Sequence, residues 1–159
     1  MSGHNPEKLQ QVLVWIGVTN QLTTTRFNQM MAESNLPLPQ FTMLNHFRRN
    51  PQQGHTITQL TSAFQANQPA ITKTVQHLVK KGYLDIQVSK EDKRVKYHFI
   101  TKAGLEAHQK AIACILPDAQ LIFAGWSVEE VDILHQSLFR LKNWLDDHRD
   151  TVGEGNHEA

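Results

Sequence analysis

Residues 67–82 read NQPAITKTVQHLVKKG, a pattern that predicts a short amphipathic helix. At helical spacing an apolar side, Ile71, Val75, Leu78 and Val79, stands opposite a polar side, Gln68, Thr72, Lys73 and Gln76. Either Asn67 or Gln68 begins the helix, and Pro69 falls in its first turn, where a missing N–H costs little. Gly82 suits the left-handed conformation that ends a helix.

The polar side of this helix carries no negative charge. Asp and Glu are absent between Asn67 and Gly82, and Lys80 and Lys81 lie in the last turn. Residues 73–102 contain eight basic and three acidic side chains, although the formal net charge of the whole chain is only +1. A local basic patch on a near-neutral chain is typical of nucleic-acid binders. Taken alone, the helix better fits an ordinary amphipathic helix with a solvated face, and its neighbours on both sides change that interpretation.

Two shorter helices are expected before this one. Pro39 opens the first, whose inward residues are Phe41, Leu44 and Phe47, and Asn50-Pro51 ends it. His55-Thr56-Ile57 is compatible with a very short strand. Thr58 is then expected to cap a helix that buries Leu60, Ala63 and Phe64. A tight connection into residues 67–82 completes a helix-turn-helix pattern.

After Gly82 the hydrophobic period changes from helical to alternating. Tyr83, Leu84, Ile86 and Val88 predict one strand, and Val95, Tyr97 and Phe99, alternating with Lys96 and His98, predict another. The polar segment Ser89–Arg94 connects them as a hairpin tip. A hairpin placed directly after a helix-turn-helix is a wing, and its charged tip is expected to contact phosphate rather than only solvent.

Long helices are expected at both ends of the chain. One runs from Pro6 to about Met31. Another is capped by Thr101 and is kinked or shifted at Pro117 before Gly125. Ser127 and Glu130 form a capping box for the last helix, which carries a seam of Val131, Leu134, Leu138, Leu141 and Leu145. These helices have more apolar surface than a small domain covers, which predicts pairing with a second copy of the chain.

The predicted fold is therefore mainly α with a small β-hairpin wing. Residues 37–100 form a winged helix-turn-helix, residues 1–36 and 101–150 are dimerisation helices, and residues 151–159 are a disordered tail. Cys114 is the only cysteine, which excludes a disulfide framework and fits a reducing cytoplasm. The N-terminus lacks a signal-peptide pattern and no apolar run is long enough for a membrane span, so we expect a cytoplasmic protein with no membrane partner.

Several segments in one register resemble the MarR family of bacterial transcription regulators. They are Leu38–Leu44, Ile57–Leu60, Leu78–Leu84 and Glu91–Val95, the last followed by Ile100–Gly104. The Asp-x-Arg pair of Asp92 and Arg94, closed by Thr101-x-x-Gly104, is similar to the family's wing signature. The resemblance covers about residues 8–148 and implies a homodimer that binds a pseudo-palindromic site on double-stranded DNA, more often as a repressor than as an activator.

The resemblance also implies which residues face the DNA. Those on the helix are Gln68, Pro69, Thr72, Lys73 and Gln76, and those on the wing are Lys90, Asp92, Lys93 and Arg94. Asp92 is expected to hold Arg94 in place. The wing base is less basic than is usual in the family, because Ile86 and Gln87 stand where basic residues are common.

Control by a small aromatic or phenolic ligand is a second expectation from the family. The candidates to line its pocket are Trp15, His46, Phe47 and His108. Each of them taken singly better fits a core or surface role, and only the family resemblance favours the group. His46 and His108 also raise metal sensing, but their spacing matches no zinc motif, and no metal or other cofactor is expected.

The sequence offers little support for redox control or for an enzyme. Cys114 lies among Ala111, Ile112 and Ile115, so we expect it to be a buried small hydrophobe, which disfavours redox control. No nucleophile elbow, phosphate loop or paired carboxylates indicate an enzyme. A winged helix that docks only proteins remains an alternative, which the basic helix disfavours.

Overall fold

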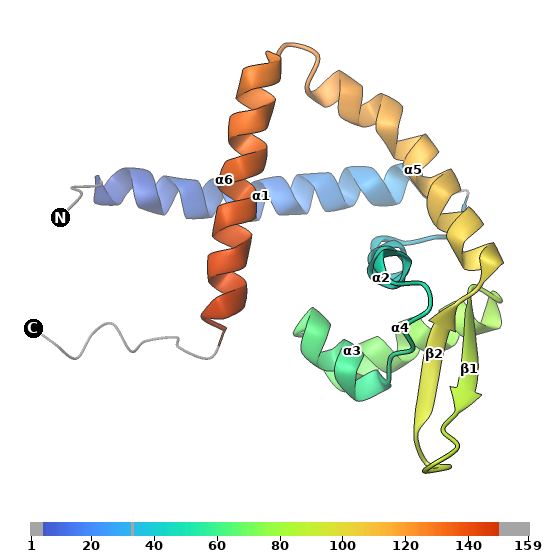
Figure 1. Ribbon diagram of the computed structural model, residues 1–159. Helices are drawn as coiled ribbons and strands as arrows, with labels where there is room; N and C mark the ends of the chain where they lie inside the picture. The colour runs from blue at the N-terminus through green and yellow to red at the C-terminus, as the bar shows by residue number, and fades with distance from the viewer. Residues whose placement is uncertain (1–4, 33, 150–159) are drawn as a thin grey trace, which may run out of the picture. The chain divides into compact units, whose positions relative to one another are not determined.

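The computed structural model describes residues 5–32 and 34–149, which form six helices and two strands. Figure 1 shows them in chain order: α1 (Pro6–Met30), α2 (Leu38–Arg49), α3 (Ile57–Phe64), α4 (Gln68–Lys80), β1 (Leu84–Val88), β2 (Lys96–Ile100), α5 (Lys102–Ile122) and α6 (Val128–Asp147). The predicted fold class, mainly α with one hairpin, is confirmed. The chain divides into two compact units, Met1–Pro117 and Asp118–Ala159, with the boundary directly after Pro117 inside α5.

The core of the first unit is built by the winged helix and the helix ends that adjoin it. It comprises Phe27, Met31, Leu36, Met43, Leu44, Phe47, Leu60, Ile71, Val75, Leu78, Leu84, Ile100 and Ala111. Leu44, Phe47, Leu60 and Leu78 have no exposed surface. Each of α2, α3 and α4 therefore contributes a fully buried anchor, and fully burying such a side chain stabilises a fold by about 1.5–3 kcal/mol.

Helix α4 begins and ends as its sequence predicts. Asn67 is the N-cap, and its side-chain oxygen accepts a hydrogen bond of 2.9 Å from the Ala70 amide. Gly82 has a φ of +71°, the left-handed conformation that suits glycine. The amide of Tyr83 then donates to the Leu78 carbonyl at 2.9 Å, so the chain leaves α4 directly into β1.

The wing is an antiparallel hairpin in which Leu84 pairs with Ile100 and Val88 pairs with Lys96. The short strand expected at 55–57 is reduced to one bridge between His55 and His98. Placing His98 on the polar side of β2 was wrong, because its side chain is 5% exposed. Its ring Nδ1 lies 3.1 Å from the His55 carbonyl oxygen, so the buried imidazole has a polar partner.

Helix α3 begins two residues earlier than predicted. Thr56, not Thr58, is the N-cap, and it forms a capping box with Gln59: the Thr56 hydroxyl accepts from the Gln59 amide at 3.2 Å. The Gln59 side chain in turn accepts from the Thr56 amide at 2.9 Å. Ala63, predicted to be buried, is exposed, because α3 turns only the side with Leu60 to the core.

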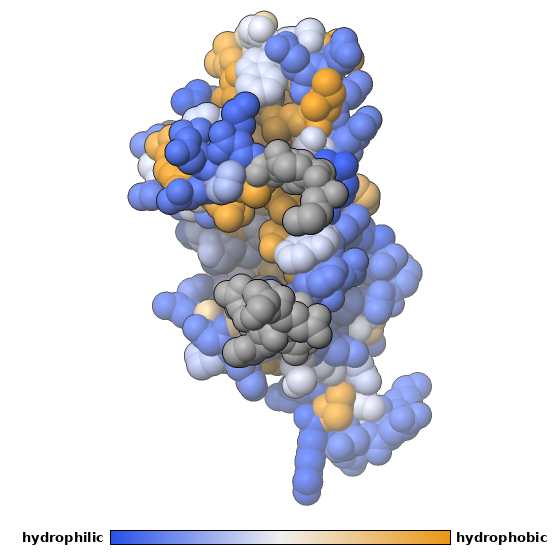
Figure 2. Space-filling model, turned by 90° about the vertical axis from the view of Figure 1, so that its left-hand side faces the viewer, coloured by the Kyte–Doolittle hydropathy of each residue, from blue (hydrophilic) through white to orange (hydrophobic). Residues whose placement is uncertain are grey.

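Most of α1 has no cover within its own unit. Only Phe27 is buried in this 25-residue helix. Its exposed apolar residues are Leu9, Val12, Leu13, Val14, Trp15, Ile16, Val18 and Leu22. Figure 2 shows one face of the molecule, on which apolar residues, in orange, lie at the surface among polar ones.

Cys114 is exposed, so the prediction of a buried thiol was wrong. Helix α5 packs into the first unit through Gly104, His108 and Ala111, with Ile115 half-buried one turn further on. The side with Cys114 is turned away from that contact. Its thiol borders a hollow of ≈ 220 Å³ shared with Ser34 and Lys110.

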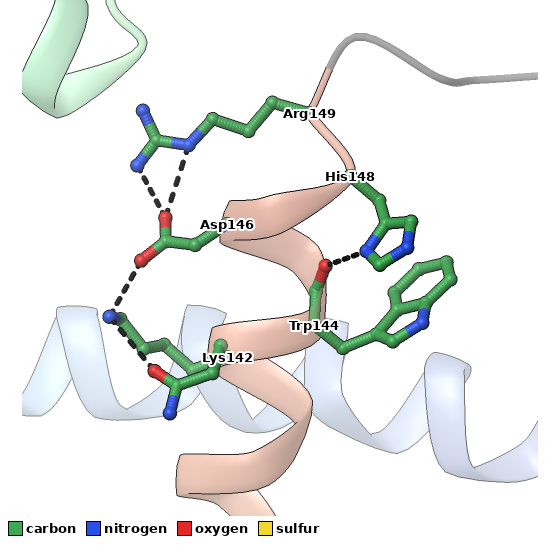
Figure 3. A network of polar contacts seen from close by, with 6 residues as sticks. Lys142, Trp144, Asp146, His148 and Arg149 are labelled. Atoms are coloured by element: carbon green, nitrogen blue, oxygen red, sulfur yellow. Dashed lines mark hydrogen bonds and ion pairs between the residues drawn. The ribbon is translucent and has the colours of Figure 1, made fainter.

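The second unit consists of the end of α5, a turn, and α6. The predicted capping box of α6 is confirmed: the Ser127 hydroxyl accepts from the Glu130 amide at 3.2 Å, and the Glu130 carboxylate accepts from the Ser127 amide at 2.7 Å. At the other end, Lys142 and Arg149 flank Asp146, and the lysine pair spans 2.6 Å (Figure 3). Hydrogen bonds from both cations lower the pKa of Asp146 to about 2. The tail predicted for residues 151–159 lies outside the described residues.

Candidate nucleic-acid interface

The polar face of α4 is open to solvent. Gln68, Pro69, Lys73 and Gln76 are exposed, and Thr72 is half-buried at the edge of the helix. The opposite side, with Ile71, Val75 and Leu78, is buried against the core. The helix is therefore held from behind, while a row of amide, hydroxyl and ammonium groups faces outward.

The tip of the wing is a turn that its own side chains fold. Ser89 Oγ accepts from the Glu91 and Asp92 amides at 3.2 and 3.4 Å. The Asp92 carboxylate accepts from the backbone amide of Arg94 at 2.9 Å. Asp92 was expected to hold the Arg94 side chain, and its hydrogen bond is instead with the Arg94 main chain, which is the usual reach of an Asp to a residue two positions on. Lys90, Lys93 and Arg94 thus project from a fixed turn.

A cleft of ≈ 690 Å³ lies between α4 and the wing. Thr72, Gln76 and Lys80 line it from α4, and Arg94, Lys96 and His98 line it from the wing. The described residues around this cleft include three basic side chains and no acidic one. The fold therefore brings the predicted helix residues Thr72 and Gln76 and the predicted wing residue Arg94 to one positively charged cleft.

Of the four residues predicted for a ligand pocket, His46 and Phe47 contact each other, with ring centroids 6.1 Å apart, whereas Trp15 and His108 lie in other surroundings. Phe47 has no exposed surface and belongs to the core, whereas Trp15 is 63% exposed on α1. His46 packs against His55 and Phe64, with ring centroids 5.0 and 5.2 Å away. Burial, followed by the charges of His55 and Arg49, lowers the pKa of His46.

His108 is buried in a setting of its own. Its ring stacks on Phe41 with centroids 5.1 Å apart, and its Nε2 lies 3.2 Å from Asn45 Oδ1. Burial and the nearby Arg48 charge lower its pKa. His108 also lines a hollow of ≈ 360 Å³ with Arg48, Leu105, Gln109 and Ile112. Arg48 and Gln109 were missed from the sequence, because nothing local sets them apart from other surface residues.

Two further findings concern metal ions and membranes. Within the described ranges, 5–32 and 34–149, no group of three or more His, Cys, Asp or Glu side chains is arranged to hold a metal ion. In the same part of the chain, no helix is both long enough and apolar enough to cross a membrane.

Comparison with known proteins shows what this winged helix resembles. Residues 34–95, from the α1–α2 turn to the wing tip, match the sequence model described as the MarR family. This segment, which is most of the winged helix, is therefore similar to that family. No curated protein matches the chain in sequence.

Solved structures share its fold over nearly their whole length. A mutant of MarR from E. coli, complexed with operator DNA, superposes with a TM-score of 0.70 at 19% identity, over 87% of this chain and 99% of that one. BldR from Sulfolobus solfataricus gives 0.70 at 20% identity, over 87% and 99%. The transcriptional regulator SlyA gives 0.74 at 18% identity, over 89% and 98%. At these identities the likeness establishes the fold.

Proposed function

We propose that this chain is a sequence-specific, DNA-binding transcriptional regulator that acts as a homodimer. The observation that carries the proposal is the positively charged cleft between α4 and the wing, where Gln76 and Arg94 face a common space. A phosphodiester backbone is the polyanion that such a surface fits. The E. coli MarR structure with operator DNA, which has the same fold, supports this choice.

In this proposal α4 enters the major groove. Lys73 donates to guanine acceptors or to a phosphate, and the amides of Gln68 and Gln76 pair with adenine edges. Arg94 lies over the minor groove or a phosphate, while Lys90 and Lys93 neutralise the backbone beside it. Helix contacts then supply sequence preference, and wing contacts supply affinity.

The apolar residues of α1 support a dimer. Eight large apolar side chains of this helix are each at least 37% exposed. In the second unit, α6 exposes Val128, Ile133, Leu138, Phe139, Trp144 and Leu145. Exposed apolar surface on this scale is unfavourable in water, and a second copy of the chain would bury it. A two-fold dimer would read half-sites about 34–36 Å apart.

Repression that a small aromatic anion relieves is the finer part of the proposal. Among the predicted pocket residues, His108 borders the hollow best suited to such a ligand. Arg48 offers a forked partner for a carboxylate, and Leu105 and Ile112 offer apolar walls. Salicylate should weaken DNA binding by the parent and leave Arg48→Ala unaffected. If salicylate weakened DNA binding by both proteins equally, the ligand would not bind in the hollow beside Arg48.

The DNA-binding assignment is tested with two variants on a panel of duplexes. Arg94→Ala should weaken binding to all sequences, since it removes a backbone contact. Gln76→Ala should change the order of preference among sequences, since it removes a base contact, with an effect of about 1–3 kcal/mol at the affected base pair. Lys110→Ala, on α5, is the control for the loss of an exposed positive charge. Parent-like binding by both variants would contradict the assignment.

A further inference from the structure

Two neighbouring lysines at the end of α4 have different surroundings. Lys80 is exposed, whereas Lys81 is half-buried and burial lowers its pKa. The Lys81 ammonium group donates to the side-chain oxygen of Gln40 at 2.6 Å and to the backbone carbonyl of Asn35. Both acceptors are uncharged, so these contacts are directional hydrogen bonds and not a charge pair.

Each partner of Lys81 is itself held in place. Gln40 lies in the first turn of α2 and is 6% exposed. Asn35 lies in the turn between α1 and α2 with a φ of +50°, a conformation that Asn tolerates better than most residues. The start of α2, directly after that turn, is also fixed to α1, because the Leu38 amide donates to the Asn28 side chain at 3.3 Å.

The backbone of Lys81 is equally fixed to α4. Lys81 is the C-cap residue, and its amide donates to the His77 carbonyl at 3.1 Å. Gly82, directly after it, donates to Val79 at 2.9 Å. Hydrogen bonds, joined by short stretches of backbone, therefore connect α1 and the α1–α2 turn to the end of the helix whose polar face is open.

We propose that Lys81 is a positioning residue, which sets the orientation of α4 relative to α1 by joining the end of α4 to the α1–α2 turn. The inference rests on the proposed function, in which α1 pairs two chains and α4 reads DNA. In such a dimer, Lys81 fixes the separation of the two reading helices. It touches no DNA itself.

A positioning role predicts a loss that depends on the number of half-sites. Two linked contacts strengthen one another only when their geometry allows both at once. Without the hydrogen bonds of Lys81, each α4 still binds its own half-site. The two α4 helices of the dimer, however, no longer match the spacing between the half-sites. A damaged fold or a lost phosphate contact would instead weaken binding to duplexes with one half-site and with two half-sites by the same factor.

The test uses duplexes that the full-length parent selects from a random pool. Each is prepared intact, with one half-site scrambled, and with one base pair inserted or removed between half-sites. The affinity of Lys81→Met for intact duplexes should be at least about tenfold lower than that of the parent, and its affinity for single half-sites should stay within about twofold of the parent's. Its preference for the original spacing should flatten. Lys81→Gln, too short to reach both oxygens, should behave alike.

Two further variants complete the design. Lys81→Arg keeps a cationic donor that reaches both oxygens and should restore most of the affinity for intact duplexes. Lys110→Met removes the same charge from an exposed position on α5 and should match the parent. Equal losses of Lys81→Met and Lys81→Gln on intact and single-half-site DNA, or no loss on either, would overturn the inference alone. A parent that selects no duplex would overturn the proposed function and the inference together.

Discussion

Gly104→Ala tests how tightly the wing, α4 and α5 are joined. A Cβ at position 104 would lie 2.3 Å from the Tyr83 carbonyl oxygen and 2.9 Å from Ile100 Cγ1. The carbonyl has little freedom to move, because it accepts a hydrogen bond of 3.1 Å from the Thr101 amide. Thr101 is fixed in turn, since its hydroxyl donates to Gly82 at 2.6 Å and accepts from Gly104 at 3.0 Å.

The expected size of the effect follows from two opposing contributions. Inserting a methyl group against fixed backbone belongs at the upper end of overpacking costs, about 3 kcal/mol. Alanine recovers about 1 kcal/mol over glycine inside a helix. The net loss is about 2 kcal/mol, which lowers the melting temperature by roughly 4–8 °C for a chain of this size.

Thermal unfolding followed by far-ultraviolet circular dichroism measures this loss. Gly125→Ala is the matched control, because a Cβ there meets nothing within 4 Å and the residue has no positive φ. Its melting temperature should stay close to that of the parent. Equal stability of Gly104→Ala and Gly125→Ala would refute the close approach of α5 to Tyr83.

Two other predictions concern stability. Burial lowers the pKa of His46, His55 and His108 from the ordinary 6.5, so the unfolded chain binds more protons just below pH 6.5. Their contribution is therefore complete above pH 6.5 and is lost as the pH falls: the melting temperature should be lower at about pH 5.5 than at about 7.5, and His46→Gln should reduce the difference. Thr56→Ala removes the N-cap of α3 and should cost about 0.5–2 kcal/mol in urea unfolding, whereas Thr58→Ala should cost less than half of that; the reverse order would restore Thr58 as the cap.

The parts of the fold that local signals determine were predictable from the sequence. The bounds of α4 follow from Asn67, Pro69 and Gly82, each of which acts on its own turn. The hairpin follows from the change of period after Gly82. The start of α3 is also encoded locally, in the Thr56–Gln59 capping box, and the prediction of Thr58 as the cap overlooked that pair.

The errors arose where a distant contact decides burial. His98 alternates with apolar residues and so was placed outside, yet its partner His55 lies 43 residues earlier in the chain. Cys114 sits among apolar neighbours, but α5 turns only the side with Ala111 toward the core. Neither outcome can be read from a window of a few residues.

Some features of the candidate site were likewise predictable from local sequence, and others depend on distant contacts. The polar face of α4 was predictable, because helical periodicity separates Gln76 from Val75 by itself. The distinction between Lys80 and Lys81 was not, because it depends on Gln40, 41 residues away. Whether Trp15, His46, Phe47 and His108 line one pocket likewise depends on how three helices pack, which the local sequence does not show.

The most direct test of the account is the salt dependence of DNA binding by the purified parent chain. If a dimer places α4 and the wing on both half-sites, on the order of 6–10 phosphate contacts should form. The affinity for a selected duplex should then fall by about 10³–10⁵ between roughly 50 and 200 mM salt. An affinity that barely changes over this range, or no binding to any duplex at the lower salt concentration, would contradict the account.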